Sequence, residues 1–186
     1  MEESFNNEEL LDNVVIQSDG PDFISISKSK FIILNVLTLN IYCIWWMYKV
    51  WKFFKERQVL DIIPAARAIF AIFFIYSLFE KIKAFAFKFG YKKDYSSEAL
   101  FALWLVGSIL GNFDQWWSLF TIFVFYAFLQ PLESLNQAFE NSDVDSHHIP
   151  ENFNGKQIGL IIFGLLLWAL VLIGLFVPDD FDTYDY

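Results

Sequence analysis

The longest uncharged stretch of this chain, Gln157 to Val177, limits the folds that the sequence can adopt. About 20 apolar residues in a helix match the hydrocarbon core of a bilayer, which is about 30 Å thick. Hydrophobic residues make up 56% of the 186 positions and charged residues only 19%. Soluble domains carry about 25% charged residues. The sequence therefore predicts an integral membrane protein built from α-helices.

Four further apolar segments precede this stretch, at 31–47, 62–79, 98–111 and 116–130. Together the five segments predict an all-α, polytopic protein with about five hydrophobic helices in one membrane domain, residues 23–178. An acidic tail at 1–22 is too poor in apolar residues to build a core, so we expect it to be flexible. A second acidic tail covers 179–186.

The first segment has an irregular interior. It is only about 17 residues long, which is the lower limit for a membrane span. Asn35, Thr38 and Asn40 bring polar side chains that either hydrogen-bond a neighbouring helix or mark a break. Asn40 also tolerates a left-handed backbone better than most residues. A straight span and a kinked or re-entrant hairpin therefore both remain open for this segment.

The second segment has a marked beginning. Asp61 is a good N-cap, and Pro64 suits the first turn of a helix, where its missing N–H has no partner to lose. Arg67 lies about six residues in, so its guanidinium can still reach headgroups or water. After Glu80 the helix is expected to continue as an amphipathic stretch at the membrane surface.

The third and fourth segments predict an antiparallel helical hairpin around a polar turn at 112–115. Gly107, Ser108 and Gly111 are small enough to let the two backbones approach closely. We expect the fourth helix to end at Pro131 and a polar, acidic loop to fill 133–156.

The charges are segregated along the chain, with −5 over residues 1–30, +7 over 31–93 and −11 over 94–186. Lys and Arg are retained on the cytoplasmic side of a membrane. If the first two segments both span, eight cations lie inside and four outside, with Arg67 embedded. If both are re-entrant or interfacial, all thirteen lie inside. Both arrangements place 131–156 inside and the tail at 179–186 outside.

The cations alternate with aromatic residues near the end of the first segment. Trp45, Trp46, Tyr48 and Trp51 cluster where the lysines begin, which predicts an interfacial aromatic belt. Such a basic and aromatic mixture suits an anionic lipid surface. Candidate residues for contact with lipid or another anion are Arg67, Lys49 and Lys52. Nucleic acid is excluded as a partner, because the pI is 4.6 and no nucleic-acid-binding fold is recognisable.

Two motifs carry a resemblance to a family. The run KFIILNVLTLNIYCIWWMYKVWKFFKE is followed by IIPAARAIFAIFFIYSLFEKI. This pair resembles a group of uncharacterised bacterial multi-pass inner-membrane proteins with the patterns TLGIYxxYWxYKxW and PxARAIFAIFF. The resemblance covers about residues 23–177, and implies location in a bacterial inner membrane without any activity to carry over. Asn40 stands where the pattern has glycine.

Catalysis has no candidate residues, because no nucleophile with a base, no pair of embedded carboxylates and no phosphate-binding glycine loop is recognisable. The cluster of Asp143, Asp145, His147 and His148 lacks the spacing of a metal site, so we assign neither a metal nor a cofactor. The chain is thus expected to be a non-catalytic accessory or scaffold component, with a membrane-protein partner or a homo-oligomer among its contacts. A lipid-interacting sensor is a further class, and the main alternative is a small transporter or channel subunit.

Overall fold

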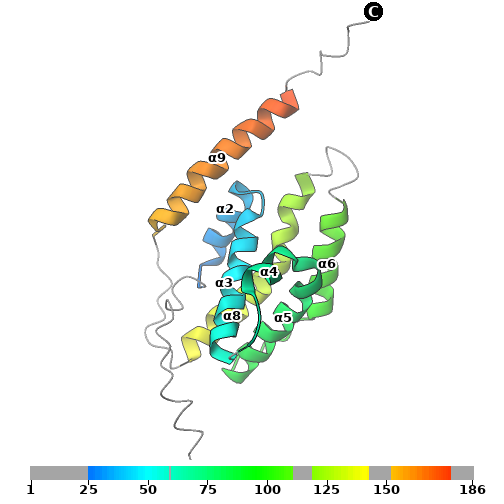
Figure 1. Ribbon diagram of the computed structural model, residues 1–186, viewed down its shortest axis with the longest axis vertical. Coiled ribbons are helices and arrows are strands. Elements are labelled where there is room, and N and C mark those ends of the chain that lie inside the picture. Colours follow the sequence, from blue (N-terminus) through cyan, green and yellow to red (C-terminus); the bar gives the residue numbers. More distant parts are fainter. Residues whose placement is uncertain (1–24, 59, 111–118, 143–151, 177–186) are drawn as a thin grey trace, which may run out of the picture.

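The computed structural model describes residues 25–58, 60–110, 119–142 and 152–176. Every regular element within these ranges is helical, which confirms the all-α prediction. The elements in chain order are α2 (Lys28–Leu37), α3 (Ile41–Gln58), α4 (Pro64–Ile69), α5 (Ala71–Lys88), α6 (Ser97–Leu110), the 3₁₀ helix η2 (Leu119–Phe128), α8 (Leu129–Asn141) and α9 (Gly155–Phe176) (Figure 1). The predicted tails at 1–22 and 179–186, the turn at 112–115 and the cluster at 143–148 lie outside the described residues.

The first apolar segment is broken into two helices at 38–40. Leu39 and Asn40 both have a left-handed backbone, with φ of 50° and 68°. The Thr38 hydroxyl donates to the carbonyl of Leu34 at 2.7 Å and accepts from the backbone N–H of Tyr42 at 3.0 Å. Thr38 thereby closes α2 and caps α3. The first segment is therefore a sharp helical hairpin, as the kinked alternative predicted, and α2 is only about 15 Å long.

The second segment begins with Pro64 at the first position of α4, but its N-cap is Ile63 instead of the predicted Asp61. A residue before proline is pushed out of the helical region, and Ile63 accordingly adopts an extended conformation with φ −102° and ψ 101°. The helix then breaks at Phe70, whose ψ is 45°, before α5 continues to Lys88. Both of the first two segments are thus interrupted.

The predicted close approach at Gly107 is confirmed. A Cβ atom there would lie 2.8 Å from Cγ2 of Val124, so α6 and η2 can pack this tightly only with glycine at that position.

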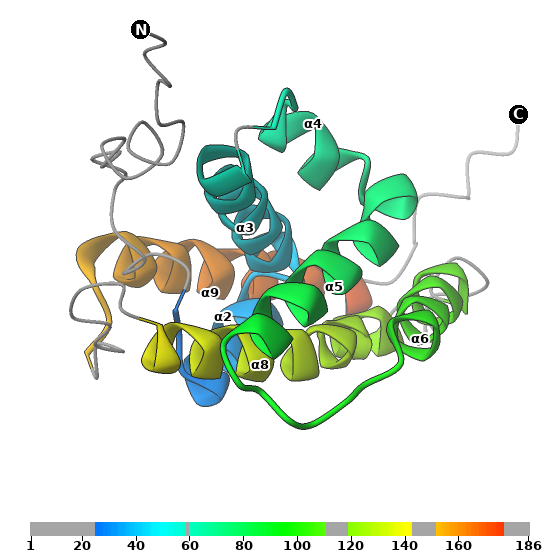
Figure 2. The ribbon, with the colours of Figure 1, turned by 90° about the horizontal axis from the view of Figure 1, so that it is seen from below.

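Two predictions about the following segment are wrong. Pro131 does not end the helix, because it lies in the first turn of α8, where proline is tolerated. Residues 133–141, which we expected in a polar loop, are helical. The physical reason is an amphipathic face that buries Leu132, Leu135, Ala138 and Phe139 against the core. Figure 2 shows η2 running directly into α8.

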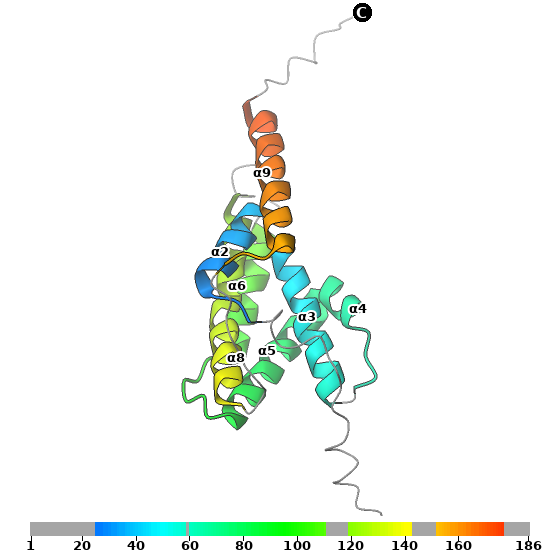
Figure 3. The same ribbon diagram turned by 90° about the vertical axis from the view of Figure 1, so that its left-hand side faces the viewer.

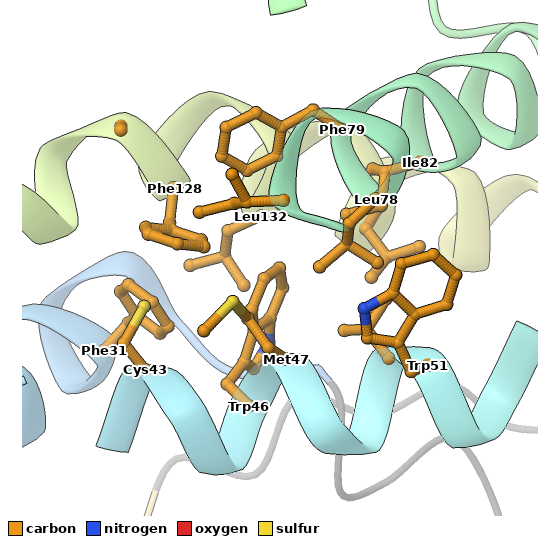
Figure 4. Close-up of a cluster of buried hydrophobic side chains, with 14 of the residues drawn as sticks. Phe31, Cys43, Trp46, Met47, Trp51, Leu78, Phe79, Ile82, Phe128 and Leu132 are labelled. Carbon is orange, nitrogen blue, oxygen red and sulfur yellow. The ribbon is translucent and has the colours of Figure 1, made fainter. Parts of the chain in front are cut away.

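The aromatic belt is also partly wrong, because two of its members belong to the core. Trp46 and Trp51 are fully buried, whereas Trp45 and Tyr48 are half-buried. The Trp46 ring meets the rings of Phe31 and Phe128 edge-on, with centroids 5.6 Å and 6.1 Å apart. Figure 4 shows this cluster between α3 and the helices above it.

The last helix, α9, packs against α2 and leaves most of its surface exposed. A Cβ atom at Gly164 would lie 2.5 Å from the carbonyl oxygen of Leu37, so the backbones of α9 and α2 nearly touch. Trp168 Nε1 donates to the carbonyl of Val36 at 2.9 Å. The C-terminal half of α9 extends beyond the other helices (Figures 1 and 3).

Among the described helices, one is long and apolar enough to cross a membrane by length and composition, over Gly155–Gly174. Only 6% of its apolar window is buried inside the protein. The described residues thus contain one candidate span, whereas the sequence predicts about five hydrophobic helices, with a kinked or re-entrant course open for the first two.

Candidate functional site

Many large apolar side chains stay exposed on α9, α6, η2 and the α4–α5 junction. They include Ile162, Leu166, Leu170 and Ile173 on α9, Leu103, Val106 and Ile109 on α6, Phe123 and Tyr126 on η2, and Ile69, Phe70, Ile72 and Phe73 around the α4–α5 junction. Soluble monomers rarely expose apolar surface on this scale, and such patches mark contacts with a membrane or another protein.

Most charged side chains of the described residues lie toward one end of the bundle, which we call the charged end. It is formed by the last turns of α3 and α5, the beginnings of α2 and α6, the segment 89–96 and α8. In each of these helices the charged part lies toward the lower side of Figure 1. The cations at this end are Lys28, Lys30, Lys52, Lys55, Arg57, Lys81, Lys83, Lys88, Lys92 and Lys93. The bundle therefore has one polar, mainly basic end and one apolar end.

Ion pairs connect the elements of the charged end. Glu133 on α8 pairs with Lys28 at the beginning of α2 and with Lys93 in the segment after α5. The hydrogen bond from Lys28 and the charge of Lys93 hold the pKa of the Glu133 carboxyl below its usual value. Lys83 pairs with Asp94 at 2.8 Å, and its hydrogen bond lowers the pKa of the Asp94 carboxyl.

Arg67 on α4 is held between two aromatic rings. Its guanidinium carbon lies 4.5 Å from the centroid of a Trp51 ring and 5.0 Å from that of Phe74. Such stacking fixes the plane of the guanidinium but occupies none of its N–H donors. Within the described part of the chain Arg67 forms no salt bridge and donates no side-chain hydrogen bond. A half-buried cation thus presents a full set of donors without an acceptor.

A second donor near Arg67 lacks a partner. Trp51 is fully buried, and its Nε1–H has no hydrogen-bond acceptor among the residues that the structure describes. Figure 4 shows this nitrogen on the edge of the ring turned toward Met47. Leaving a buried donor unpaired costs about 1–3 kcal/mol. The core beside Met47 therefore carries the cost of an unsatisfied donor.

The three predicted contact residues do not form one site. Lys49 lies over the ring of Trp45 at 5.4 Å, and Lys52 pairs with Glu56 at 3.6 Å. Lys49 and Lys52 are three residues apart on α3, so they share a face of the helix that Trp51 does not share. The structure thus separates Arg67 from the two lysines.

A cavity of about 510 Å³ lies between the α2–α3 turn, α3, the α4–α5 junction, α6 and η2. Ile44 and Met47 of α3, Ala68 and Ala71 of the junction, Trp104 of α6 and Phe128 of η2 are among its lining residues. The lining set contains no charged residue, and its polar members are Asn40, Cys43, Trp104 and Ser108. Its volume falls within the range of about 300–1,000 Å³ typical of small-molecule sites.

The sequence reasoning missed two features of this region. Trp51 was assigned to a membrane interface, although it is the buried platform of Arg67. The spacing of Met47, Trp51 and Phe54, all buried, follows a helical face and could have indicated this. The cavity lies beside the two helix breaks at 38–40 and Phe70. No pattern in the sequence predicts it.

No group of three or more metal-binding side chains occurs within the described ranges. Cys43 is buried and forms no disulfide. It therefore packs as a small core residue and is not an accessible thiol. No protein-family model, curated protein or solved structure matches this chain.

Proposed function

We propose that this protein is a non-catalytic component of a bacterial inner membrane, an accessory or scaffold protein that contacts anionic lipid. The observation that carries this proposal is the exposed apolar surface of α9. A core helix of a soluble protein would be covered, whereas the apolar window of α9 is only 6% buried. An uncovered apolar helix of this length matches the thickness of a hydrocarbon core.

The separation of charged and apolar ends supports the same proposal. With α9 across the bilayer, the apolar parts of α6, η2 and the α4–α5 junction face the lipid, and the charged end faces the headgroups. The α2–α3 hairpin then enters the membrane without crossing it, because its turn at 38–40 lies away from the charged end (Figure 1). At this turn Thr38 is fully buried, and Gly164 of α9 packs on the carbonyl of Leu37, which supplies part of the protein cover that a broken backbone needs in a membrane.

This arrangement corresponds to the second charge count, in which the cations of the first two segments all lie on the cytoplasmic side. A polytopic topology with re-entrant first segments is therefore part of the proposal. The transporter alternative is less well supported, since the cavity between these segments is lined by apolar side chains and no charged residue. A transport pathway usually places ionisable groups near the membrane midplane.

Three measurements test the proposal. After a carbonate wash of membranes, the protein should remain in the pellet, and its release into the soluble fraction would contradict membrane integration. A reporter fused after Tyr186 should read periplasmic, and one inserted near Asp143 should read cytoplasmic. The opposite pair of signals would contradict the orientation. Mild detergent extraction should then recover a stoichiometric protein partner or a homo-oligomer if the chain is a scaffold.

A further inference from the structure

We propose that the cavity between α3, the α4–α5 junction, α6 and η2 holds one acyl chain of an anionic phospholipid, whose phosphate is bound by Arg67. This inference rests on the proposed membrane location and adds a specific site to it. It differs from general attraction of lipid to the charged end, because it names one cation and one cavity.

The rim of the cavity indicates what can enter it. Ile41, Ile44, Ile69 and Ile72 belong to the lining and are 45%, 45%, 70% and 50% exposed. A water-soluble ligand would have to pass this apolar rim, whereas an acyl chain would reach it directly from the surrounding hydrocarbon. The lining thus favours a lipid tail.

The position of Arg67 supplies the polar half of the site. Ala68 lines the cavity, and Arg67 is the residue directly before it. The guanidinium stacks on Trp51, which lies one helical turn from the lining residue Met47, on the side of the charged end. A lipid with its phosphate at Arg67 and its tail along the cavity therefore points in the same direction as the lipids of the leaflet that meets the charged end.

The unpaired donors of Arg67 give this position a preference for an anion. The guanidinium has N–H groups without acceptors among the described residues. A phosphate oxygen can accept from a guanidinium in a bidentate geometry, and such charge-assisted bonds are about twice as strong as neutral ones. The stacking on Trp51 and Phe74 holds the guanidinium in place before the lipid arrives.

The test uses the full chain in detergent after delipidation, with added phosphatidylglycerol or phosphatidylcholine of identical acyl chains, and native mass spectrometry as the readout. The wild-type protein should retain one phosphatidylglycerol at concentrations that leave phosphatidylcholine unbound. Arg67→Met should weaken this retention about tenfold or more, corresponding to the loss of a charge-assisted hydrogen bond. Arg67→Lys should restore part of it. Lys55→Met, at an exposed position of α3, is the matched control and should retain the lipid as the wild type does.

A second measurement uses the wild-type protein, so it does not depend on the folding of a variant. Phosphatidylglycerol with a photoreactive diazirine in its acyl chain should crosslink to the peptides that contain Ile44, Met47 or Trp104. Crosslinks confined to α9 and the outer face of α6 would overturn the cavity site. Equal retention of both lipids by the wild type, or unchanged retention in Arg67→Met, would overturn the phosphate site. The carbonate wash separates these outcomes from failure of the proposed function, because a protein in the pellet without a retained lipid contradicts only the site.

Discussion

Helices α3 and α9 are both rich in aromatic and aliphatic residues, but the protein buries only one of them. Trp46, Trp51 and Phe54 of α3 are fully buried, whereas Leu166 and Leu170 of α9 are 62% and 66% exposed. The apolar face of α3 is covered by other helices, whereas that of α9 stays largely uncovered within the described protein. Hydrophobicity alone therefore does not reveal whether a segment is covered by protein or left exposed.

The largest expected effect comes from placing charges on α9. Leu166→Arg combined with Leu170→Arg should prevent stable insertion, because each central arginine costs about 2.5–3.5 kcal/mol on insertion scales. The measurement is the fraction of protein in the carbonate-washed pellet. The control combines Gln58→Arg with Gln137→Arg, which adds the same charge at exposed positions on α3 and α8. Full retention of the α9 variant in the pellet would contradict the proposal that α9 contacts lipid whereas α3 contacts protein.

A cavity in the core of α3 should affect folding and leave insertion unchanged. Trp46→Ala should lower the free energy of unfolding by about 3–5 kcal/mol, as expected for a fully buried tryptophan. Unfolding of the helical signal with increasing sodium dodecyl sulfate provides the measurement. The control is the neighbouring Trp45→Ala, whose ring is only half-buried and which should cost clearly less. Equal losses for the two variants would mean that α3 does not pack as described.

The contact between α2 and α9 can be tested by comparing two glycines of α9. Gly164→Ala should lower the free energy of unfolding by about 1–3 kcal/mol, because the new methyl group meets the carbonyl of Leu37. Gly159→Ala is the matched control, since nothing lies within 4 Å of its Cβ position. That variant should be neutral or slightly more stable, because alanine favours a helix over glycine. Thermal unfolding in detergent distinguishes the two variants. A larger loss of stability in Gly159→Ala than in Gly164→Ala would contradict the packing of α9 against α2.

The smallest expected effect is electrostatic and concerns the charged end. The pKa of Glu133 is lowered from its ordinary 4.5, so its ion pairs stabilise the fold above that pH. This contribution is lost as the pH falls through the lowered pKa, because the carboxyl then takes up a proton in the folded state as well. Glu133→Gln should therefore cost about 0.2–1 kcal/mol near pH 7 and nothing at a pH well below 4.5. A difference that grows on acidification would contradict the pairing.

Several elements of the fold could be predicted from the sequence because their causes are local. The uncharged run that forms α9 and Pro64 at the first position of α4 are of this kind. The break at Asn40 was one of two alternatives, since a polar residue in an apolar segment can either bond to a neighbouring helix or end its own helix. The structure shows the second, with Asn35 and Thr38 donating to carbonyls of α2.

Other elements depend on partners that are distant in the sequence. The helical extension over 133–141 forms because Leu135 and Phe139 pack against α5 and α3. The acidic residues of this stretch made its apolar face hard to recognise in the sequence. Trp51 was misassigned for the same reason, as only the folded bundle brings α4 across it. For the candidate site, the sequence singled out Arg67, but its aromatic platform and the adjacent cavity follow from tertiary packing.

The hydrogen bond from Trp168 to the carbonyl of Val36 joins residues 132 positions apart. During synthesis the α2–α3 hairpin therefore leaves the ribosome long before the helix that completes its environment. Until α9 has been made, this carbonyl accepts only from the backbone N–H of Leu39, at 3.4 Å. The end of α2 thus gains its complete set of contacts only after the last helix of the described chain has been translated.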